Sequence, residues 1–189
     1  HLLSGPLEPT NEPYTIAKIS AIKLCRFYNE QYGTNFISAM PTNLYGPGDN
    51  FDLETSHVLP ALIRKIHEAK IHLKSEVVLW GDGSPRREFL FSDDLADSLI
   101  FLMQKVDADL IGEHINVGVG KDISIQELAQ LIADIVGHKG TFTWDTSKPN
   151  GPPRKLLDVS RLTSLGWKAS TSLSEGIEKT YRWYLEHYR

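Results

Sequence analysis

The sequence has a single cysteine, Cys25, among its 189 residues. One cysteine cannot form an internal disulfide, and its place in an apolar helical segment favours a buried structural thiol over a nucleophile. No apolar run approaches the roughly 20 residues that a membrane span needs, and no signal-peptide pattern is present. The net charge of −4 leaves no basic excess for nucleic acid. These absences predict a cytoplasmic protein that binds neither membranes nor nucleic acid.

The chain also lacks a Gly-x-Gly-x-x-Gly loop, with which a Rossmann fold binds dinucleotide phosphates. It nevertheless carries a Tyr-x-x-x-Lys pair, Tyr14 and Lys18, that such a loop normally accompanies. On a helix, positions i and i+4 share a face, so the Lys18 ammonium can lie beside the Tyr14 phenol. A nearby cation favours a phenolate, which makes Tyr14 a candidate proton donor to a carbonyl under reduction. Taken alone, the pattern is more often an ordinary solvated helix face.

Helical and extended segments alternate along the chain. The patterns predict helices at residues 14–32, 56–73, 93–105, 124–136, 158–165 and 172–187, and strands at 35–41, 77–80, 87–91, 114–117 and 141–145. This alternation predicts an α/β fold with at least some parallel strand pairing. Ser124 and Glu127 form a capping box, and Asp93 or Asp94 is expected to cap the helix that follows it.

The first predicted helix is apolar around most of its circumference. Its apolar positions are Ile16, Ala17, Ile19, Ala21, Ile22, Leu24, Cys25, Phe27 and Tyr28. A helix of this kind must be buried on more than one side. It lies either inside one core or between this chain and a second subunit.

Several separated motifs follow that helix in order. They are Pro41-Thr42-Asn43-Leu44-Tyr45-Gly46-Pro47, Arg87-Glu88-Phe89-Leu90-Phe91-Ser92-Asp93-Asp94, His114-Ile115-Asn116-Val117-Gly118 and Asp158-Val159-Ser160-Arg161. Together with Tyr14 and Lys18, this set resembles the extended short-chain dehydrogenase/reductases that act on nucleotide sugars, over almost the whole chain. Within that family, residues 56–64, 78–81 and 148–158 are similar to the GDP-L-fucose synthases, which are NADPH-dependent epimerase-reductases.

The resemblance implies the C-terminal part of a Rossmann-type α/β fold with its smaller substrate-binding domain. Residues 1–54 would belong to the NADP-binding Rossmann domain, and residues 55–189 would form mainly the nucleotide-sugar domain, with some segments returning to the first. The glycine-rich half, a catalytic serine and an acid/base cysteine would precede His1, so this chain is expected to be inactive alone. The resemblance also favours a homodimer through the helix that runs from Tyr14 to Tyr28.

The resemblance further implies a cofactor, NADP, and the residues that face it. These residues are Tyr14, Lys18, Pro41, Thr42, Asn43, Leu44 and His57. Tyr14 would donate a proton to the ketone oxygen, with Lys18 stabilising the phenolate. His57 would exchange protons with the carbons beside the ketone, because histidine titrates near working pH. The alternative for His57 is a capping role at the start of its helix.

A GDP-sugar needs cations for its diphosphate and an apolar slot for its base. The charge could come from Arg64 or Lys65, together with Arg87 and Lys155. By the same resemblance, Asn43 would reach the substrate. Val58, Leu62, Leu79 and Trp80 could line the slot. Arg87 could instead pair with Glu88 or Asp93, and Trp80 could instead be a core aromatic side chain. No metal site is expected.

The implied reaction of the complete enzyme is the epimerisation and reduction of GDP-4-keto-6-deoxy-D-mannose to GDP-L-fucose. Another nucleotide-sugar epimerase, reductase or dehydratase of the same family is one alternative. A non-catalytic nucleotide-sugar-binding module is the other.

Overall fold

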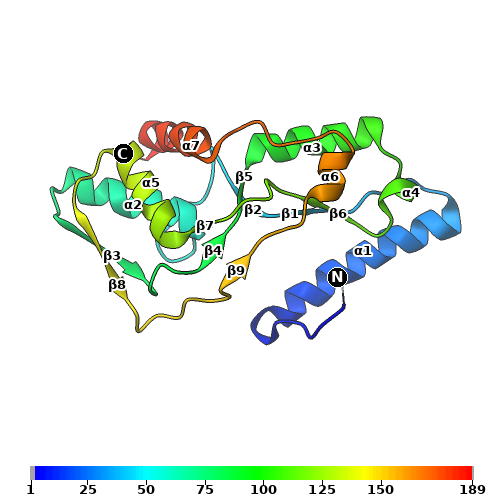
Figure 1. Ribbon diagram of the computed structural model, residues 1–189, viewed down its shortest axis with the longest axis horizontal. Helices are drawn as coiled ribbons and strands as arrows, with labels where there is room; N and C mark the ends of the chain where they lie inside the picture. Colours follow the sequence, from blue (N-terminus) through cyan, green and yellow to red (C-terminus); the bar gives the residue numbers. More distant parts are fainter. Residues whose placement is uncertain (1–2, 189) are drawn as a thin grey trace.

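The computed structural model of the protein describes residues 3–188 and is elongated, with one hydrophobic core toward each end (Figure 1). Its helices are η1 (Pro9–Asn11), α1 (Glu12–Tyr32), α2 (Val58–Ile71), α3 (Ser92–Lys105), α4 (Ala108–Ile111), α5 (Ile125–Val136), α6 (Ser160–Ser164) and α7 (Leu173–His187). Each helix predicted from sequence is confirmed, with ends that differ by at most two residues. The short η1 and α4 were not predicted, since one turn leaves little periodicity to detect.

The strands are short. They are β1 (Ala39–Pro41), β2 (Asn43–Tyr45), β3 (Glu76–Trp80), β4 (Arg86–Arg87), β5 (Phe89–Phe91), β6 (Ile115–Val117), β7 (Ile123–Ser124), β8 (Thr141–Asp145) and β9 (Arg154–Lys155). The strand predicted at 87–91 is divided at Glu88 into β4 and β5. The sequence patterns did not reveal β2, β7 or β9, because two or three residues are too few to show alternation.

Parallel pairing brings segments together that are far apart in the chain. Strand β1 lies beside β6, β2 beside β5 and β3 beside β8, all parallel, which confirms the predicted α/β character. A further sheet has the order β7-β4-β9, in which β4 is antiparallel to β7 and parallel to β9. Its register places Arg87 opposite Lys155.

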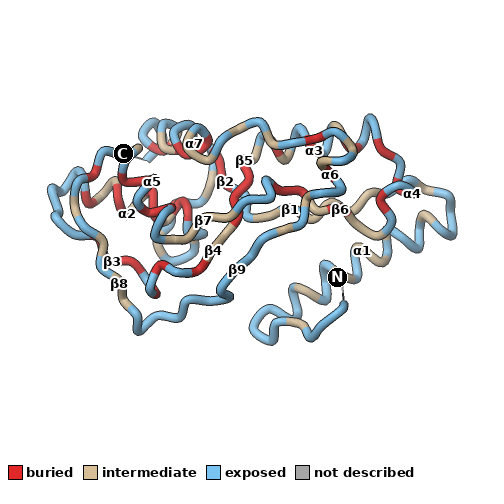
Figure 2. Tube along the Cα trace, viewed as in Figure 1, coloured by how far each residue is buried: buried red, intermediate tan, exposed pale blue. Residues whose placement is uncertain are grey.

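Two groups of buried side chains stabilise the two ends of the molecule. One group joins α2, α5 and α7 to β3 and β8, and includes Leu59, Leu62, Ile63, Ile66, Leu79, Leu128, Ile132 and Ile177. The other joins α3, α4 and α6 to β5 and β6, and consists of Leu90, Leu102, Val106, Ile111, Ile115, Val117, Leu162 and Trp167. Figure 2 shows the buried positions as red stretches within each end.

Helix α1 runs along the edge of the molecule and none of its residues is buried (Figure 2). Leu24 is 55% exposed and Phe27 is 52% exposed. The interpretation that this helix lies inside one core of the chain is therefore wrong. Its outer apolar side chains stand uncovered, whereas Ile19, Ile22 and Cys25 are half-buried.

The capping box of Ser124 and Glu127 is confirmed at the start of α5, with both reciprocal hydrogen bonds present. The expected cap at Asp93 or Asp94 is wrong, because α3 begins at Ser92 and its N-cap residue is Phe91. The Asp94 carboxylate points inward instead. It accepts hydrogen bonds from Ser170 Oγ at 2.9 Å and from the Thr171 amide at 3.0 Å, and so ties α3 to the segment before α7.

Within residues 3–188, no helix combines the length and the apolar composition that crossing a membrane requires.

Candidate functional site

The start of α1, the β1–β2 segment and the start of α2 surround a hollow of about 770 Å³. The side chains that line it include Tyr14, Pro41, Thr42, Asn43, Leu44 and His57, together with Arg87 at one side. Six of the seven residues predicted to face the cofactor therefore meet in one cavity. The seventh, Lys18, lies behind Tyr14 on the same helix.

Tyr14 and Lys18 lie in the first two turns of α1, where Pro13 suits a position that needs no backbone donor. The Lys18 Nζ lies 5.4 Å from the centre of the Tyr14 ring, so the two side chains share a helix face as their spacing predicts. The Tyr14 side chain is 60% exposed. A bound carbonyl compound in the hollow can therefore reach the phenol.

His57 precedes α2 as its N-cap residue, but its imidazole makes no capping hydrogen bond. The ring lines the hollow instead, beside Asp49. Burial raises the pKa of the Asp49 carboxyl, and the nearby His57 partly opposes that shift. Asp49 was missed in the sequence, where its only signal is the Gly46-Pro47-Gly48 turn before it.

The polar side chains of the β1–β2 junction are anchored on a single carbonyl group. Asn43 Nδ2 donates to the Glu88 carbonyl oxygen at 2.7 Å, and Thr42 Oγ1 donates to the same oxygen at 3.2 Å. These bonds fix the rotamer of Asn43 at the edge of the hollow.

A second hollow, of about 240 Å³, brings together the four side chains predicted to receive the base. Leu62 and Leu79 are buried beneath it, while Val58 and Trp80 lie at its rim. Trp80 is 62% exposed, so it is not a core aromatic side chain. A third hollow, of about 160 Å³, is lined by Val58, Trp80 and Arg87. Because Val58 lines all three hollows, they form neighbouring parts of one site.

Ammonium groups flank the indole ring of Trp80. Lys65 Nζ lies 5.3 Å from its centre and Lys148 Nζ lies 5.5 Å from it. Burial lowers the pKa of Lys65. Lys148 was not among the predicted site residues, since it lies in a loop without periodicity.

The sequence left open whether Arg64 or Lys65 supplies a cation to the site. The structure brings Lys65 to the second hollow and leaves Arg64 outside it. Arg64 forms an ion pair with Glu68 at 2.7 Å and donates to the Phe51 carbonyl oxygen at 3.1 Å. Its guanidinium is therefore engaged by Glu68 and the Phe51 carbonyl group.

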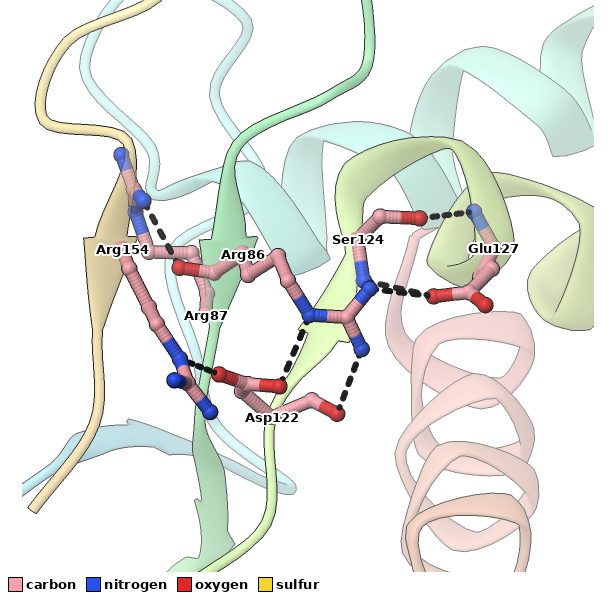
Figure 3. A network of polar contacts seen from close by, with 6 residues as sticks. All are labelled: Arg86, Arg87, Asp122, Ser124, Glu127 and Arg154. Carbon is pink, nitrogen blue, oxygen red and sulfur yellow. Dashed lines mark hydrogen bonds and ion pairs between the residues drawn. The ribbon is translucent and has the colours of Figure 1, made fainter.

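Arg87 is half-buried, and its Nη1 donates to the Arg86 carbonyl oxygen at 2.8 Å. Among residues 3–188, no ion pair joins Arg87 to Glu88 or to Asp93, so that alternative is not realised. Figure 3 shows the Arg87 guanidinium on the other side of β4 from that of Arg86. Burial lowers the pKa of Arg87, and an anion is the natural partner for a cation in such a place.

A network of charges holds the sheet that carries Arg87 (Figure 3). The Asp122 carboxylate accepts from Arg86 of β4 at 2.8 Å and also from Arg154 of β9. Hydrogen bonds from Arg86 and then Arg154 lower the pKa of Asp122. The network joins β4 to β9, whose register puts Lys155 opposite Arg87. Lys155 is exposed and lines none of the three hollows.

The described part of the chain contains no group of three or more His, Cys, Asp or Glu side chains that could hold a metal ion. The site can bind an anion at Arg87, a planar ring at Trp80 and a carbonyl compound beside Tyr14.

Comparisons with known proteins point in the same direction. The chain is 58% identical over 186 residues to Probable GDP-L-fucose synthase 1 of Oryza sativa subsp. japonica, an alignment that covers 98% of this chain and 56% of that protein. It is 54% identical to GDP-L-fucose synthase of Escherichia coli (strain K12), with 98% of this chain and 60% of that protein covered. The chain thus spans little more than half the length of these relatives.

A solved structure, a GDP-L-fucose synthetase from Naegleria fowleri bound to NADP, superposes with a TM-score of 0.89. It is 34% identical in sequence, and the match covers 98% of this chain and 59% of that one. The model of the NAD dependent epimerase/dehydratase family matches residues 1–118, which include Tyr14, Lys18, His57 and Arg87. By this match, and by the arrangement of those residues around one site, the chain belongs to the NAD dependent epimerase/dehydratase family.

Proposed function

We propose that the protein to which these residues belong converts GDP-4-keto-6-deoxy-D-mannose to GDP-L-fucose by epimerisation and NADPH-dependent reduction. One observation carries the proposal: Tyr14 and His57 line one hollow, Trp80 lines the next, and Arg87 lies between them. That order matches the order of sugar, diphosphate and base in a nucleotide sugar. The names of the relatives supply the particular sugar and base.

NADP is the proposed cofactor, and the residues present suit its reactive end. The half-open hollow beside the exposed Tyr14 phenol has room for a nicotinamide ring against residues 41–44. When bound, NADPH supplies the hydride for the reduction. The residues proposed to hold or face NADP are Tyr14, Lys18, Pro41, Thr42, Asn43, Leu44 and His57.

The protein's own groups are proposed to move the protons. Tyr14 donates a proton to the ketone oxygen, and the adjacent Lys18 ammonium stabilises the phenolate that results. His57 is one of the acid/base groups that exchange protons with the carbons beside the ketone. Its imidazole is suited to this role because it faces the hollow without being engaged as a cap.

The remaining substrate contacts are assigned by chemistry. Asn43 reaches the sugar, while Arg87 and Lys155 bind the diphosphate through charge-assisted hydrogen bonds. The base binds in the second hollow, against Val58, Leu62, Leu79 and Trp80, with Lys65 at its edge. Arg64 is not retained in this set, because its pairing with Glu68 occupies it.

We further infer a homodimer that covers the apolar surface of α1, and a cytoplasmic location. The uncovered Leu24 and Phe27 support the dimer. Residues 1–54 are proposed to belong with the cofactor-binding domain, and residues 55–189 mainly with the substrate domain. The second hydrophobic core, which gathers side chains between residues 90 and 167, supports the return of some later segments to the first domain.

The experiment that tests the function separates its two chemical steps in the natural full-length protein. In His57→Gln, exchange of solvent deuterium into the carbons beside the ketone should slow by roughly 10²–10⁴-fold, the range for losing one acid/base group. Hydride transfer to an already epimerised ketone should change little. In Tyr14→Phe, hydride transfer should fall by about the same factor.

His72→Gln is the matched control, since His72 lies at the opposite end of α2 and its ring bonds to the Glu68 carbonyl oxygen. Both steps should proceed normally in that variant. Normal deuterium exchange in His57→Gln would remove His57 from the mechanism. Failure of the unaltered protein to turn over any GDP-4-keto sugar would refute the function.

A further inference from the structure

Glu88 is a buried charged residue that lies next to Arg87 and lines none of the three hollows. It lies between β4 and β5, directly after Arg87, and its exposed fraction is 0%. A carboxylate that is wholly withdrawn from water persists only where hydrogen bonds replace its hydration. The groups that hydrogen-bond to Glu88 therefore indicate which segments of the chain it joins.

The two carboxylate oxygens connect different segments of the chain. Oε1 accepts from the amides of Val119 and Gly120, each at 2.6 Å, in the turn between β6 and β7. Oε2 accepts from the Leu157 amide at 3.0 Å, in the segment that follows β9. Space around the carboxylate is limited, since a Cβ at Gly118 would lie 2.4 Å from Oε1.

The backbone of the same residue holds the catalytic end of the site. Its carbonyl oxygen accepts from Asn43 Nδ2 at 2.7 Å and from Thr42 Oγ1 at 3.2 Å. One buried residue thus joins the β1–β2 junction, β4, the β6–β7 turn and the segment after β9.

The hydrogen bond to Leu157 matters because the pairing of β9 with β4 is so short. Only Arg154 and Lys155 pair with β4, at the edge of the β7-β4-β9 sheet, so few backbone hydrogen bonds hold β9. Asp122 secures the first residue of this strand through Arg154. The Glu88 carboxylate secures the chain two residues beyond Lys155, so the cation is anchored on both sides.

We propose that Glu88 is a positioning residue for the diphosphate: by holding the end of β9 against β4, it sets Lys155 beside Arg87 so that both cations face one anion. Glu88 does not touch the ligand. The inference rests on the proposed function, because it takes the anion to be the diphosphate of a nucleotide sugar.

The test is Glu88→Gln in the natural full-length protein. The substitution keeps the size of the side chain but turns an amide NH₂ toward backbone N–H donors, which removes at least one accepted bond. Once the end of β9 is released, Lys155 no longer makes its charge-assisted hydrogen bond to the diphosphate, so GDP affinity should fall by about 10- to 150-fold. Affinity for guanosine, which has no diphosphate, should stay unchanged. Calorimetry with GDP and with guanosine measures both.

Asp94→Asn is the matched control. Asp94 is also a buried carboxylate, 5% exposed, and it accepts bonds from Ser170 and Thr171 away from the three hollows. It should lower the Tm to a similar extent as Glu88→Gln while leaving GDP affinity intact. Leu157→Pro is a second probe, because proline removes the backbone donor that Glu88 Oε2 accepts, and it should reproduce the selective loss of GDP affinity.

Equal losses of GDP and guanosine affinity in Glu88→Gln, or unchanged GDP affinity in both Glu88→Gln and Leu157→Pro, would overturn the positioning role. If Glu88→Gln does not fold, the result with Leu157→Pro decides alone. Failure of the unaltered protein to bind GDP would instead count against the proposed function.

Discussion

Trp80 illustrates how much one exposed side chain can contribute to recognition. It ends β3, projects over a slot floored by Leu62 and Leu79, and has two lysine ammonium groups near its ring. An indole in this position offers a stacking face to a planar base. In the proposed complex, the neighbouring lysines would add donors for acceptor atoms on the edge of that base.

We expect Trp80→Ala to weaken binding of GDP by about 5- to 150-fold, because stacking of a base on an aromatic side chain contributes about 1–3 kcal/mol. Calorimetry on the full-length protein would measure the loss. Tyr32→Ala is the control, since Tyr32 is also 62% exposed but lies at the far end of α1, outside the three hollows. Equal GDP affinity in the two variants would show that the base binds elsewhere.

Among the elements, the β7-β4-β9 sheet depends on charge for its stability. Its strands are only two residues long, and Asp122 bridges two of them through Arg86 and Arg154. Because these hydrogen bonds lower the pKa of Asp122, the folded protein favours its ionised form. The stabilisation is present above the unfolded-state pKa of about 3.9 and is lost as the pH falls through the lower folded-state pKa.

We therefore expect Asp122→Asn to lower the Tm at about pH 7, where Asp122 is ionised in both states, and to lower it by less at about pH 3, below the unfolded-state pKa of about 3.9. Thermal unfolding followed by circular dichroism at both pH values would measure this difference. Asp109→Asn, at an exposed position on α4, should leave the Tm unchanged throughout. A Tm difference that did not shrink in acid would mean that the carboxylate contributes through packing and not through its charge.

Helix α1 is the other element whose surroundings matter, since several of its apolar side chains, Leu24 and Phe27 among them, are exposed. We expect the double variant Leu24→Glu/Phe27→Glu to weaken dimerisation of the full-length protein by at least about 30-fold, the effect of losing one hot spot of about 2 kcal/mol. Sedimentation equilibrium would measure the dimer constant.

The control for that prediction is Ile100→Glu/Met103→Glu on α3, whose side chains are 54% and 82% exposed. It should leave the dimer intact. A full-length protein that sediments as a monomer at all concentrations would contradict the assignment of α1 to an interface.

In the whole molecule, the site lies between two separately packed ends, and the parts proposed to bind base and diphosphate belong to described elements. The 189-residue chain contains no glycine-rich phosphate loop of the kind that binds a dinucleotide. We therefore expect this chain by itself to bind NADPH far more weakly than its longer relatives do, and to show no turnover. Calorimetry that found micromolar NADPH binding to the 189 residues would contradict this expectation.

The elements could be predicted from the chain because their signals are local. Apolar periodicity placed every long helix, and the capping box of Ser124 and Glu127 located the start of α5. The spacing of Tyr14 and Lys18 was enough to put both on one helix face, since the geometry of a single helix determines which side chains are neighbours.

Tertiary structure decided whatever depends on partners distant in the chain. Local spacing did not show whether Lys65 or Arg64 reaches the site. Only the packing of α2 places Lys65 beside Trp80 and pairs Arg64 with Glu68. Asp94 has the sequence context of a cap, yet its partners lie more than 70 residues away. The sequence indicated Glu88 only as a possible partner of Arg87, because the amides that its carboxylate binds are brought together only by parallel pairing and short strands.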